Sequence, residues 1–189
     1  MKNIAIFASG NGSNFEAISR AVLRGDININ IALLICDKPG VNVICRANAL
    51  GIPTAIYDPK NYSNRDDYET QILATLCDYE IDFIVLAGYM RIVGKKLLSV
   101  FEGRIINIHP SVLPEFPGLN AIKKAFDAGV KQTGVTIHYI DSGIDTGPII
   151  AQETISVLPD DTLKKLEARV HDVEHRLYIS VLQCMFKER

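Results

Sequence analysis

The sequence predicts an α/β protein whose sheet is doubly wound, Rossmann-like and mostly parallel, with an antiparallel part near the C-terminus. Short apolar segments rich in strand-forming residues alternate along the chain with segments whose apolar residues recur every three or four positions. Strands and helices that alternate in this way are joined by right-handed crossovers, which build a parallel sheet. Only a loop separates the last two predicted strands, so we expect that pair to be antiparallel.

Each element of the N-terminal half has its own sequence pattern. The predicted strands are compact apolar runs, and they cover residues 3–8, 29–36, 53–57 and 82–87. The fourth of these is apolar throughout after Asp82, which indicates that both of its faces are covered. The predicted helices begin after the glycine-rich turn 9–14, at Val43, at a cap on Ser63 or Asn64, and at about Lys95. The third helix carries one apolar stripe, made of Tyr68, Ile72, Leu76 and Tyr79.

The C-terminal half contributes three more strands and two helices. A short strand at 104–106 leads into residues 107–111, and a helix through Ile122 and Phe126 ends at Gly129. Residues 134–140 alternate with a period of two, and residues 148–157 form the last predicted strand. A long helix starts at about Asp161. It packs on the sheet through residues that step by threes and fours: Leu163, Leu166, Val170, Val173, Leu177, Val181 and Cys184.

The composition is that of a soluble globular protein with a single domain, residues 1–189. Apolar residues make up 48% and charged residues 22%, and the net charge of −2 argues against a nucleic-acid-binding face. The apolar runs are too short to span a bilayer and no signal-peptide region is evident, so we expect no membrane contact and a cytoplasmic location. Cysteines at 36, 45, 77 and 184 lack metal-binding or redox spacing, and we expect them to be reduced and mostly in the core.

The glycine-rich turn 9–14 connects the first strand to the first helix. Glycines let a ligand approach the backbone, and free N–H groups at the start of a helix favour an anion. Gly10 and Gly12 fit the first two positions of the dinucleotide fingerprint, but Phe15 occupies the third, and no P-loop Gly-Lys-Ser/Thr follows. We therefore predict a site for a single phosphate, which is compatible with Ser13 as the helix cap.

Asn107 and His109 lie where a buried strand stops at Pro110. In an open α/β sheet this carboxyl edge binds ligands, and residues two apart share one face. We expect the segment 90–93 and the acidic loop 141–147 among the loops at the same edge. Asn, His and Asp without an activated Ser or Cys indicate direct acyl transfer or hydrolysis, in which Asn and protonated His stabilise an oxyanion. Alternatively, Asn107 caps a turn and His109 fills the wall of a pocket.

Five motifs stand out by their order and spacing along the chain. They are Gly10-Asn11-Gly12-Ser13-Asn14, Ala87-Gly88-Tyr89-Met90-Arg91-Ile92, Asn107-Ile108-His109-Pro110-Ser111, Pro117-Gly118 and Asp145-Thr146-Gly147-Pro148-Ile149-Ile150. Together they closely resemble the motifs of the folate-dependent glycinamide ribonucleotide formyltransferases of purine synthesis. The resemblance covers essentially the whole chain and implies the formyltransferase fold.

The resemblance also implies roles for individual residues. Asn107, His109 and Asp145 match the family's catalytic trio: Asn107 holds the formyl oxygen, His109 is the general acid, and Asp145 favours its charged form. The matches to substrate-binding residues are Gly12, Ser13 and Asn14 for the phosphate and Glu174 for the ribose hydroxyls. The matches to folate contacts are Arg65, Met90, Arg91, Ile92, Val93 and Asp141, with the pterin against 141–145. His138 is expected to support the trio. His171 stands where some relatives carry Gln, and its role stays open.

The implied reaction transfers the formyl group of 10-formyltetrahydrofolate to the amine of 5′-phosphoribosylglycinamide on the route to IMP. Both substrates are small molecules, and neither nucleic acid nor a membrane takes part. The folate is a co-substrate, no metal is expected, and the protein is a monomer or a homodimer.

Four alternatives share parts of these patterns. A formyltetrahydrofolate hydrolase would admit water in place of the amine, but its relatives carry an extra N-terminal domain, for which we expect no room before Lys2. A formyltransferase for another amine acceptor is the second, and its methionyl-tRNA type carries an extra C-terminal domain. The third is a zinc protease, because His171 and His175 are spaced i and i+4, but Asp172 stands where that motif needs Glu. The fourth, a nucleotide-binding module, leaves the trio unexplained.

Overall fold

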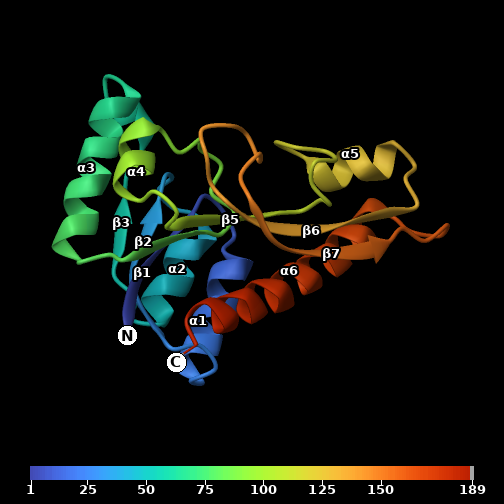
Figure 1. The fold of residues 1–189 in the computed structure, drawn as a ribbon, viewed down its shortest axis with the longest axis horizontal. Coiled ribbons are helices and arrows are strands. Elements are labelled where there is room, and N and C mark those ends of the chain that lie inside the picture. The colour runs from blue at the N-terminus through green and yellow to red at the C-terminus, as the bar shows by residue number, and fades with distance from the viewer. Residues whose placement is uncertain (188–189) are drawn as a thin grey trace.

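The computed structural model describes residues 1–187, and within them seven strands form one sheet in the order β3-β2-β1-β4-β5-β6-β7 (Figure 1). The strands are β1 (Lys2–Ala8), β2 (Ile29–Cys36), β3 (Thr54–Ile56), β4 (Phe83–Leu86), β5 (Ile105–His109), β6 (Gln132–Tyr139) and β7 (Ile149–Ser156). Neighbouring strands from β3 to β5 are parallel, whereas β6 is antiparallel to both β5 and β7. The predicted mostly parallel sheet with an antiparallel C-terminal part is therefore confirmed.

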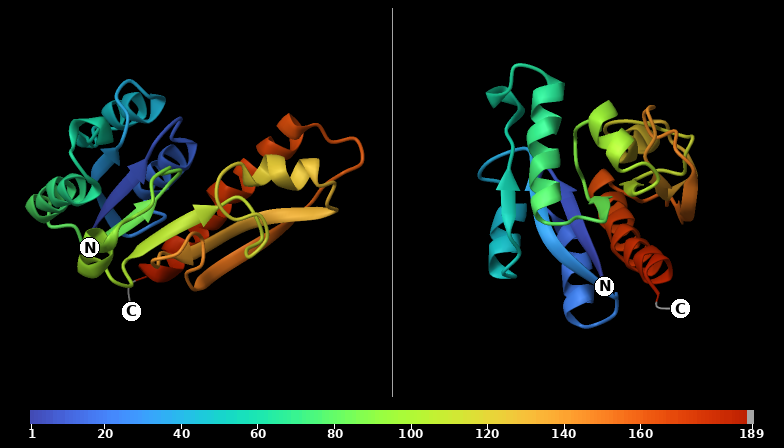
Figure 2. Two further views of the ribbon diagram at one scale, coloured as in Figure 1. Left: turned by 90° about the horizontal axis from the view of Figure 1, so that it is seen from above. Right: turned by 60° about the vertical axis from the view of Figure 1, so that its left-hand side comes forward.

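Helices pack on both faces of the sheet (Figures 1 and 2). They are α1 (Ser13–Leu23), α2 (Asn42–Ala49), α3 (Arg65–Asp78), α4 (Lys95–Val100), α5 (Ala121–Asp127) and α6 (Leu163–Met185), with a 3-10 turn η1 (Pro59–Asn61). We call the side packed by α1, α2 and α6 the α6 face, and the side packed by α3 and α4 the α3 face. None of the helices in residues 1–187 combines the length and the apolar character needed to cross a bilayer.

The sheet separates two apolar clusters because side chains alternate along each strand. In β1, Ile4 and Ile6 join the cluster on the α6 face, whereas Ala5 and Phe7 join the cluster on the α3 face. The strands β2 and β4 divide in the same way, which explains why the predicted strand 82–87 is apolar throughout after Asp82. The position of a residue in this alternation, its phase, therefore tells on which face of the sheet its side chain lies. The same rule applies to polar residues at the strand ends.

Two helix ends differ from the prediction. Gly12, not Ser13, is the N-cap of α1; it has a left-handed φ of 77° and no side chain that caps the helix. Glycine adopts this backbone conformation without a Cβ clash, so the chain can turn tightly there. Tyr79 follows the end of α3 and is 39% exposed, so it does not extend the buried stripe of that helix. The predicted cap at Asn64 is confirmed, since its side chain accepts from the Asp67 N–H.

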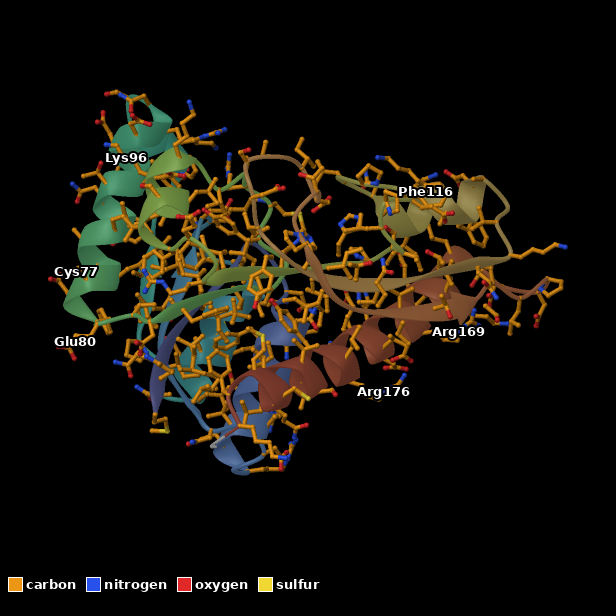
Figure 3. The ribbon with its side chains drawn as sticks, in the orientation of Figure 1. Cys77, Glu80, Lys96, Phe116, Arg169 and Arg176 are labelled. Carbon is orange, nitrogen blue, oxygen red and sulfur yellow. The ribbon has the colours of Figure 1, made fainter. Side chains whose placement is uncertain are left out.

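Only one of the four cysteines lies in the core. Cys36 is buried, but Cys45, Cys77 and Cys184 are exposed, and all four are free thiols. Cys77 lies on the outer side of α3, as Figure 3 shows. The prediction that most cysteines are core residues was wrong because apolar neighbours along a helix do not share its buried face.

The helix α6 is fixed to the sheet by Tyr178, which lies outside the predicted apolar stripe. Its side chain is completely buried, and its hydroxyl donates to the Leu86 carbonyl at 2.9 Å and lies 3.4 Å from the Ile106 carbonyl. Burial raises the pKa of Tyr178 well above its ordinary value, so the group stays a hydroxyl donor. The two carbonyls belong to β4 and β5, directly before the segments that carry Gly88 and Asn107.

We predict that Tyr178→Phe lowers the free energy of unfolding by about 1–2 kcal/mol, because a buried donor to the sheet is lost while the ring is kept. Urea unfolding followed by circular dichroism measures the change. Tyr79→Phe removes the same atom from an exposed tyrosine and should change stability by less than about 0.5 kcal/mol. Equal losses in the two variants would mean that the Tyr178 hydroxyl does not tie α6 to the sheet.

Candidate active site

The end of β5 places Asn107 and His109 side by side on the α3 face. Ile105 packs in the cluster on that face, and residues two and four positions later share its orientation. The neighbouring strand β6 adds His138, which pairs with Asn107 in the sheet register. The side chains of His109 and His138 are 6% and 0% exposed, so three polar groups are concentrated in a nearly dry position.

Asp145 reaches these groups from the loop between β6 and β7. Because β6 runs against β5, this loop leaves the sheet beside Ile105, whose carbonyl accepts from the Ile140 N–H at 3.0 Å. It then folds back over the α3 face, with Asp145 in a left-handed conformation at a φ of 54°. The Asp145 carboxylate lies 3.3 Å from His109 Nδ1 and 3.6 Å from His138 Nε2.

The Asp145 carboxylate is held in its charged form by its neighbours. Burial by itself raises the pKa of Asp145. The contact with His138, the bond from the Gly118 N–H at 2.8 Å and the nearby His109 ring outweigh burial, and together they hold the pKa below its ordinary value. The predicted catalytic trio is therefore assembled around a carboxylate that is ionised at neutral pH.

Both ring nitrogens of His109 have partners in this conformation. Nε2 lies 2.9 Å from the Phe116 carbonyl oxygen, which can only accept, so Nε2 carries a hydrogen. With that hydrogen in place, the contact from Nδ1 to Asp145 is a hydrogen bond only when the ring is protonated at both nitrogens. Phe116 itself has a left-handed φ of 50° and belongs to the segment that follows β5.

The contact between Asn107 and His138 fixes the orientation of the amide. His138 Nδ1 donates to the Tyr139 carbonyl at 2.9 Å, so Nε2 accepts in the neutral ring, and it donates to Asp145 instead only when the ring is protonated. Asn107 Nδ2 lies 3.3 Å from that nitrogen and donates one of its two hydrogens to it. The second hydrogen of the same amide nitrogen is left for an oxygen atom in the cavity.

The segment after β4 is fixed by residues at the ends of β1 and β2. The Ser9 N–H donates to the Gly88 carbonyl at 3.1 Å, and the Ser9 hydroxyl accepts from the Met90 N–H at 2.8 Å. The Arg91 guanidinium donates through Nε to the Asp37 carboxylate, also at 2.8 Å. This bond and the charge of Asp37 raise the pKa of Arg91 further.

The Arg65 side chain contacts the other end of the segment after β4, at Gly94. The carboxylate of Glu69, which is buried, accepts from the N–H groups of Gly94 and Leu97 and so caps α4. A Cβ added to Gly94 would meet the Arg65 side chain at 2.8 Å, so these two residues are in contact. Arg65 is exposed there, outside the residues that line the main cavity.

A cavity of about 630 Å³ joins most of the predicted site residues. Of these, its lining includes the catalytic trio Asn107, His109 and Asp145 and the predicted folate contacts Met90, Arg91, Ile92, Val93 and Asp141. Its size is suited to a small organic molecule. Apolar side chains at its rim, among them Leu119 and Ile144, are more than half exposed.

The predicted phosphate residues Gly12, Ser13 and Asn14 lie outside this lining, at the start of α1 on the α6 face. The N-cap has no side chain, so the first N–H groups of α1 have no cap and remain available to an anion. A Cβ on Gly12 would meet Val43 at 2.4 Å, so α2 packs closely against the turn. Arg46 of α2 donates to the Asn11 carbonyl at 2.8 Å and fixes the turn from outside.

Glu174 connects this turn to the cavity. Its buried carboxylate accepts from Asn14 Nδ2 at 3.3 Å and bonds to His171 Nδ1 at 2.7 Å. His171 lines the cavity and is half exposed. The bond to Glu174 raises the pKa of His171, with smaller contributions from Glu167 and Asp172. The predicted ribose-binding and phosphate-binding residues therefore form one hydrogen-bonded group beside the cavity.

The zinc alternative finds no support in the described part of the chain. His171 bonds to Glu174, and the Nε2 atom of His175 is buried without a partner. Within residues 1–187 no group of three or more His, Cys, Asp or Glu is arranged to hold a metal ion.

Two contacts of the site were not identified from the sequence. The Phe116 carbonyl is a backbone group, and no residue type signals it. Asp37 was not singled out, because the predicted strand 29–36 ends just before it. Its phase nevertheless carries a signal: Leu33 and Ile35 belong to the α3 face, and Asp37 continues their alternation. Extending strand periodicity to the first polar residue after each strand would have found it.

Comparison with known proteins agrees with this geometry. Residues 2–182 match the model of the formyl transferase family. A phosphoribosylglycinamide formyltransferase of Bacillus subtilis is 51% identical over 183 residues, which are 97% of this chain and 94% of that protein. The crystal structure of a phosphoribosylglycinamide formyltransferase from Bacillus halodurans is 52% identical with a TM-score of 0.97, over 99% of this chain and 96% of that one. A trifunctional purine biosynthetic protein of Drosophila melanogaster is 40% identical over 177 residues, which are 92% of this chain and 13% of that longer protein.

The family match covers nearly the whole chain, and the sheet has the mostly parallel topology expected from the sequence. The chain belongs to the formyl transferase family.

Proposed function

We propose that this chain is a phosphoribosylglycinamide formyltransferase, which transfers the formyl group of 10-formyltetrahydrofolate to the amine of 5′-phosphoribosylglycinamide in purine synthesis. The observation that carries the proposal is the meeting of Asn107, His109 and Asp145 at one wall of a cavity. The similar proteins bear the same activity in their names. Residues 1–189 act as one domain, and the cytoplasm is the expected location.

The chemistry follows from the donors that face the cavity. The amine nitrogen attacks the formyl carbon, the carbonyl becomes an oxyanion, and the folate nitrogen leaves with a proton. The free hydrogen of the Asn107 amide stabilises the oxyanion, together with the Nε2 hydrogen of His109 once the Phe116 carbonyl has been displaced from it. His109 then supplies its Nε2 proton to the leaving nitrogen and takes up the proton that the attacking amine loses, while the charge of Asp145 balances the protonated ring.

His109 can act on a substrate only after it gives up one of its present bonds. The Asp145 contact is needed for charge balance, so the bond to the Phe116 carbonyl is the one that is exchanged. Entry of the formyl group therefore displaces Phe116 from Nε2, and the segment after β5 shifts with it. Product release restores the resting bond.

The two substrates approach from different faces of the sheet. The phosphate of the ribonucleotide binds the open N–H groups at the start of α1, and Glu174 holds the ribose hydroxyls. The donor occupies the cavity on the α3 face, between the segment 90–93 and Asp141. Asp141 accepts from the Gly143 N–H and from the Thr146 hydroxyl, which gives the loop over the pterin a defined shape.

We predict that Asn107→Ala and His109→Ala each lower kcat by about 10²–10³, the usual cost of losing one oxyanion donor. The assay follows the absorbance of the formyl donor with and without the ribonucleotide. Asn48→Ala, an exposed asparagine on α2, is the matched control and should retain full turnover. Near-normal turnover in folded His109→Ala would remove His109 from the proposed role. Donor consumption without ribonucleotide would indicate a hydrolase.

We predict that Gly12→Ala raises KM for the ribonucleotide at least about tenfold, because the new Cβ collides with Val43 and pushes the start of α1 out of place. Gly25→Ala is the control, since Gly25 also has a left-handed φ of 81° but has no atom within 4 Å of its Cβ position. Both variants should lose about 1 kcal/mol of stability from backbone strain, but only Gly12→Ala should lose affinity for the ribonucleotide.

We predict that His171 makes stability depend on pH. Because Glu174 raises the pKa of His171 above 6.5, its stabilising contribution is complete below about pH 6.5 and is lost as the pH rises through the folded pKa. Urea midpoints between about pH 6 and pH 9 should therefore fall more steeply in the wild type than in His171→Gln. Burial lowers the pKa of His175, so the urea midpoint of the wild type relative to that of His175→Gln should be higher at high pH than at low pH.

A further inference from the structure

Asp37 is a buried carboxylate that the proposed chemistry leaves unexplained. Its side chain is completely buried directly after β2, outside the residues that line the cavity. One of its oxygens accepts from Arg91 Nε at 2.8 Å, and the other, Oδ1, has no partner among residues 1–187. Taking a carboxylate out of water costs free energy, and a single bond to Arg91 offsets only part of that cost. The buried charge of Asp37 therefore calls for an explanation. A hydrogen bond that only fixes the segment after β4 does not require a charged partner, because the Ser9 hydroxyl already makes such a bond with the Met90 N–H.

The surroundings of Asp37 leave Arg91 as its counter-ion. Asp37 continues the α3-face phase of β2, where Tyr68 and Tyr89 lie. The hydroxyls of these tyrosines bond to each other at 2.7 Å. Burial, with the charge of Asp37 as a further cause, raises the pKa of Tyr68 to about 12 and that of Tyr89 higher still, so neither gives up a proton to Asp37.

Arg91 uses only one edge of its guanidinium for this pair. Nε is bonded to Asp37, and within residues 1–187 neither Nη atom makes a hydrogen bond. The side chain is 44% exposed and lines the cavity. Because the guanidinium is planar and rigid, fixing Nε also fixes the direction of the two Nη groups. A pair of parallel N–H donors matches a carboxylate.

We propose that Asp37 is a positioning residue, which holds Arg91 so that its two Nη groups bind a carboxylate at the tail of the formyl donor. The inference rests on the proposed function. The tail of a tetrahydrofolate carries its carboxylates at the end remote from the formyl nitrogen. Arg91 follows β4, which is the neighbour of the strand β5 that carries Asn107 and His109, on the same α3 face.

Other charges of the site support this choice of ligand group. The phosphate site lies at the start of α1 on the opposite face of the sheet, so the phosphate is already accounted for. The other cationic groups that line the cavity are Lys123, paired with Asp127, His171, bonded to Glu174, and His109 in its protonated form, which contacts Asp145. Arg91 is thus the lining cation on the α3 face with donors to spare among the described residues.

The test compares two formyl donors: 10-formyltetrahydrofolate, and the same molecule with its glutamate replaced by a methylamide. Asp37→Ala should raise KM for the complete donor about tenfold, the order expected for one charge-assisted contact, while kcat changes less than about twofold. KM for the methylamide donor and for the ribonucleotide should stay the same. Asp37→Asn keeps an oxygen that can accept from Arg91 Nε, so it should recover part of the affinity.

Two further variants separate positioning from support of the fold. Adding Asp37→Ala to Arg91→Ala should cause no further loss of affinity for the complete donor, because the two residues act as one unit. Asp161→Ala removes another nearly buried aspartate that is paired with an arginine, Arg169, away from the cavity. It should leave the preference between the two donors unchanged.

Each outcome decides a different point. Equal increases in KM for both donors, or a loss confined to kcat, would show that Asp37 only supports the turn after β4 and would overturn the inference. The same comparison is made with Asp37→Asn if Asp37→Ala does not fold. A wild type that transfers formyl from neither donor would overturn the proposed function itself. Wild-type transfer with no donor preference in any variant would overturn only the role of Asp37.

Discussion

The site depends on the change of strand direction between β5 and β6. Since β5 is parallel to β4, its carboxyl end lies at the ligand-binding edge. Because β6 is antiparallel, Asn107 faces His138 across the ladder, and the loop that follows must cross back over the sheet before it can reach His109. The carboxylate of Asp145 therefore reaches the histidines from above the sheet.

In the proposed function, the sheet also separates two anion-binding regions. Phosphate recognition belongs to the α6 face, where a helix start without a cap lies beside Glu174. Recognition of the donor belongs to the α3 face, where the buried Asp37 pairs with the exposed Arg91. Both meet only at the edge that carries Asn107 and His109. The backbone of the sheet thus keeps two anionic ligands apart while their reacting atoms come together.

Much of the fold could be predicted from the sequence, because it follows from local periodicity. The pattern distinguishes strands with both faces covered from helices with one apolar stripe, and it shows a final pair of strands with only a loop between them. The trio followed from the end of a strand and from motif resemblance. What could not be predicted depends on contacts distant in the chain. Tyr178 lies off the apolar stripe of α6 yet is its most deeply buried large residue, and Asp37 is a partner of Arg91 only because β2 and β4 both flank β1.

In the resting enzyme the Phe116 carbonyl competes with the substrate for His109 Nε2. This competitor is part of the chain, so its effective concentration is set by the fold and cannot be diluted. Any substrate that needs the same nitrogen has its apparent affinity reduced by the fraction of molecules in which the carbonyl occupies it. Sequence changes between β5 and α5 that touch neither substrate can therefore adjust that fraction, and with it the working concentration range of the enzyme, without altering the reacting groups.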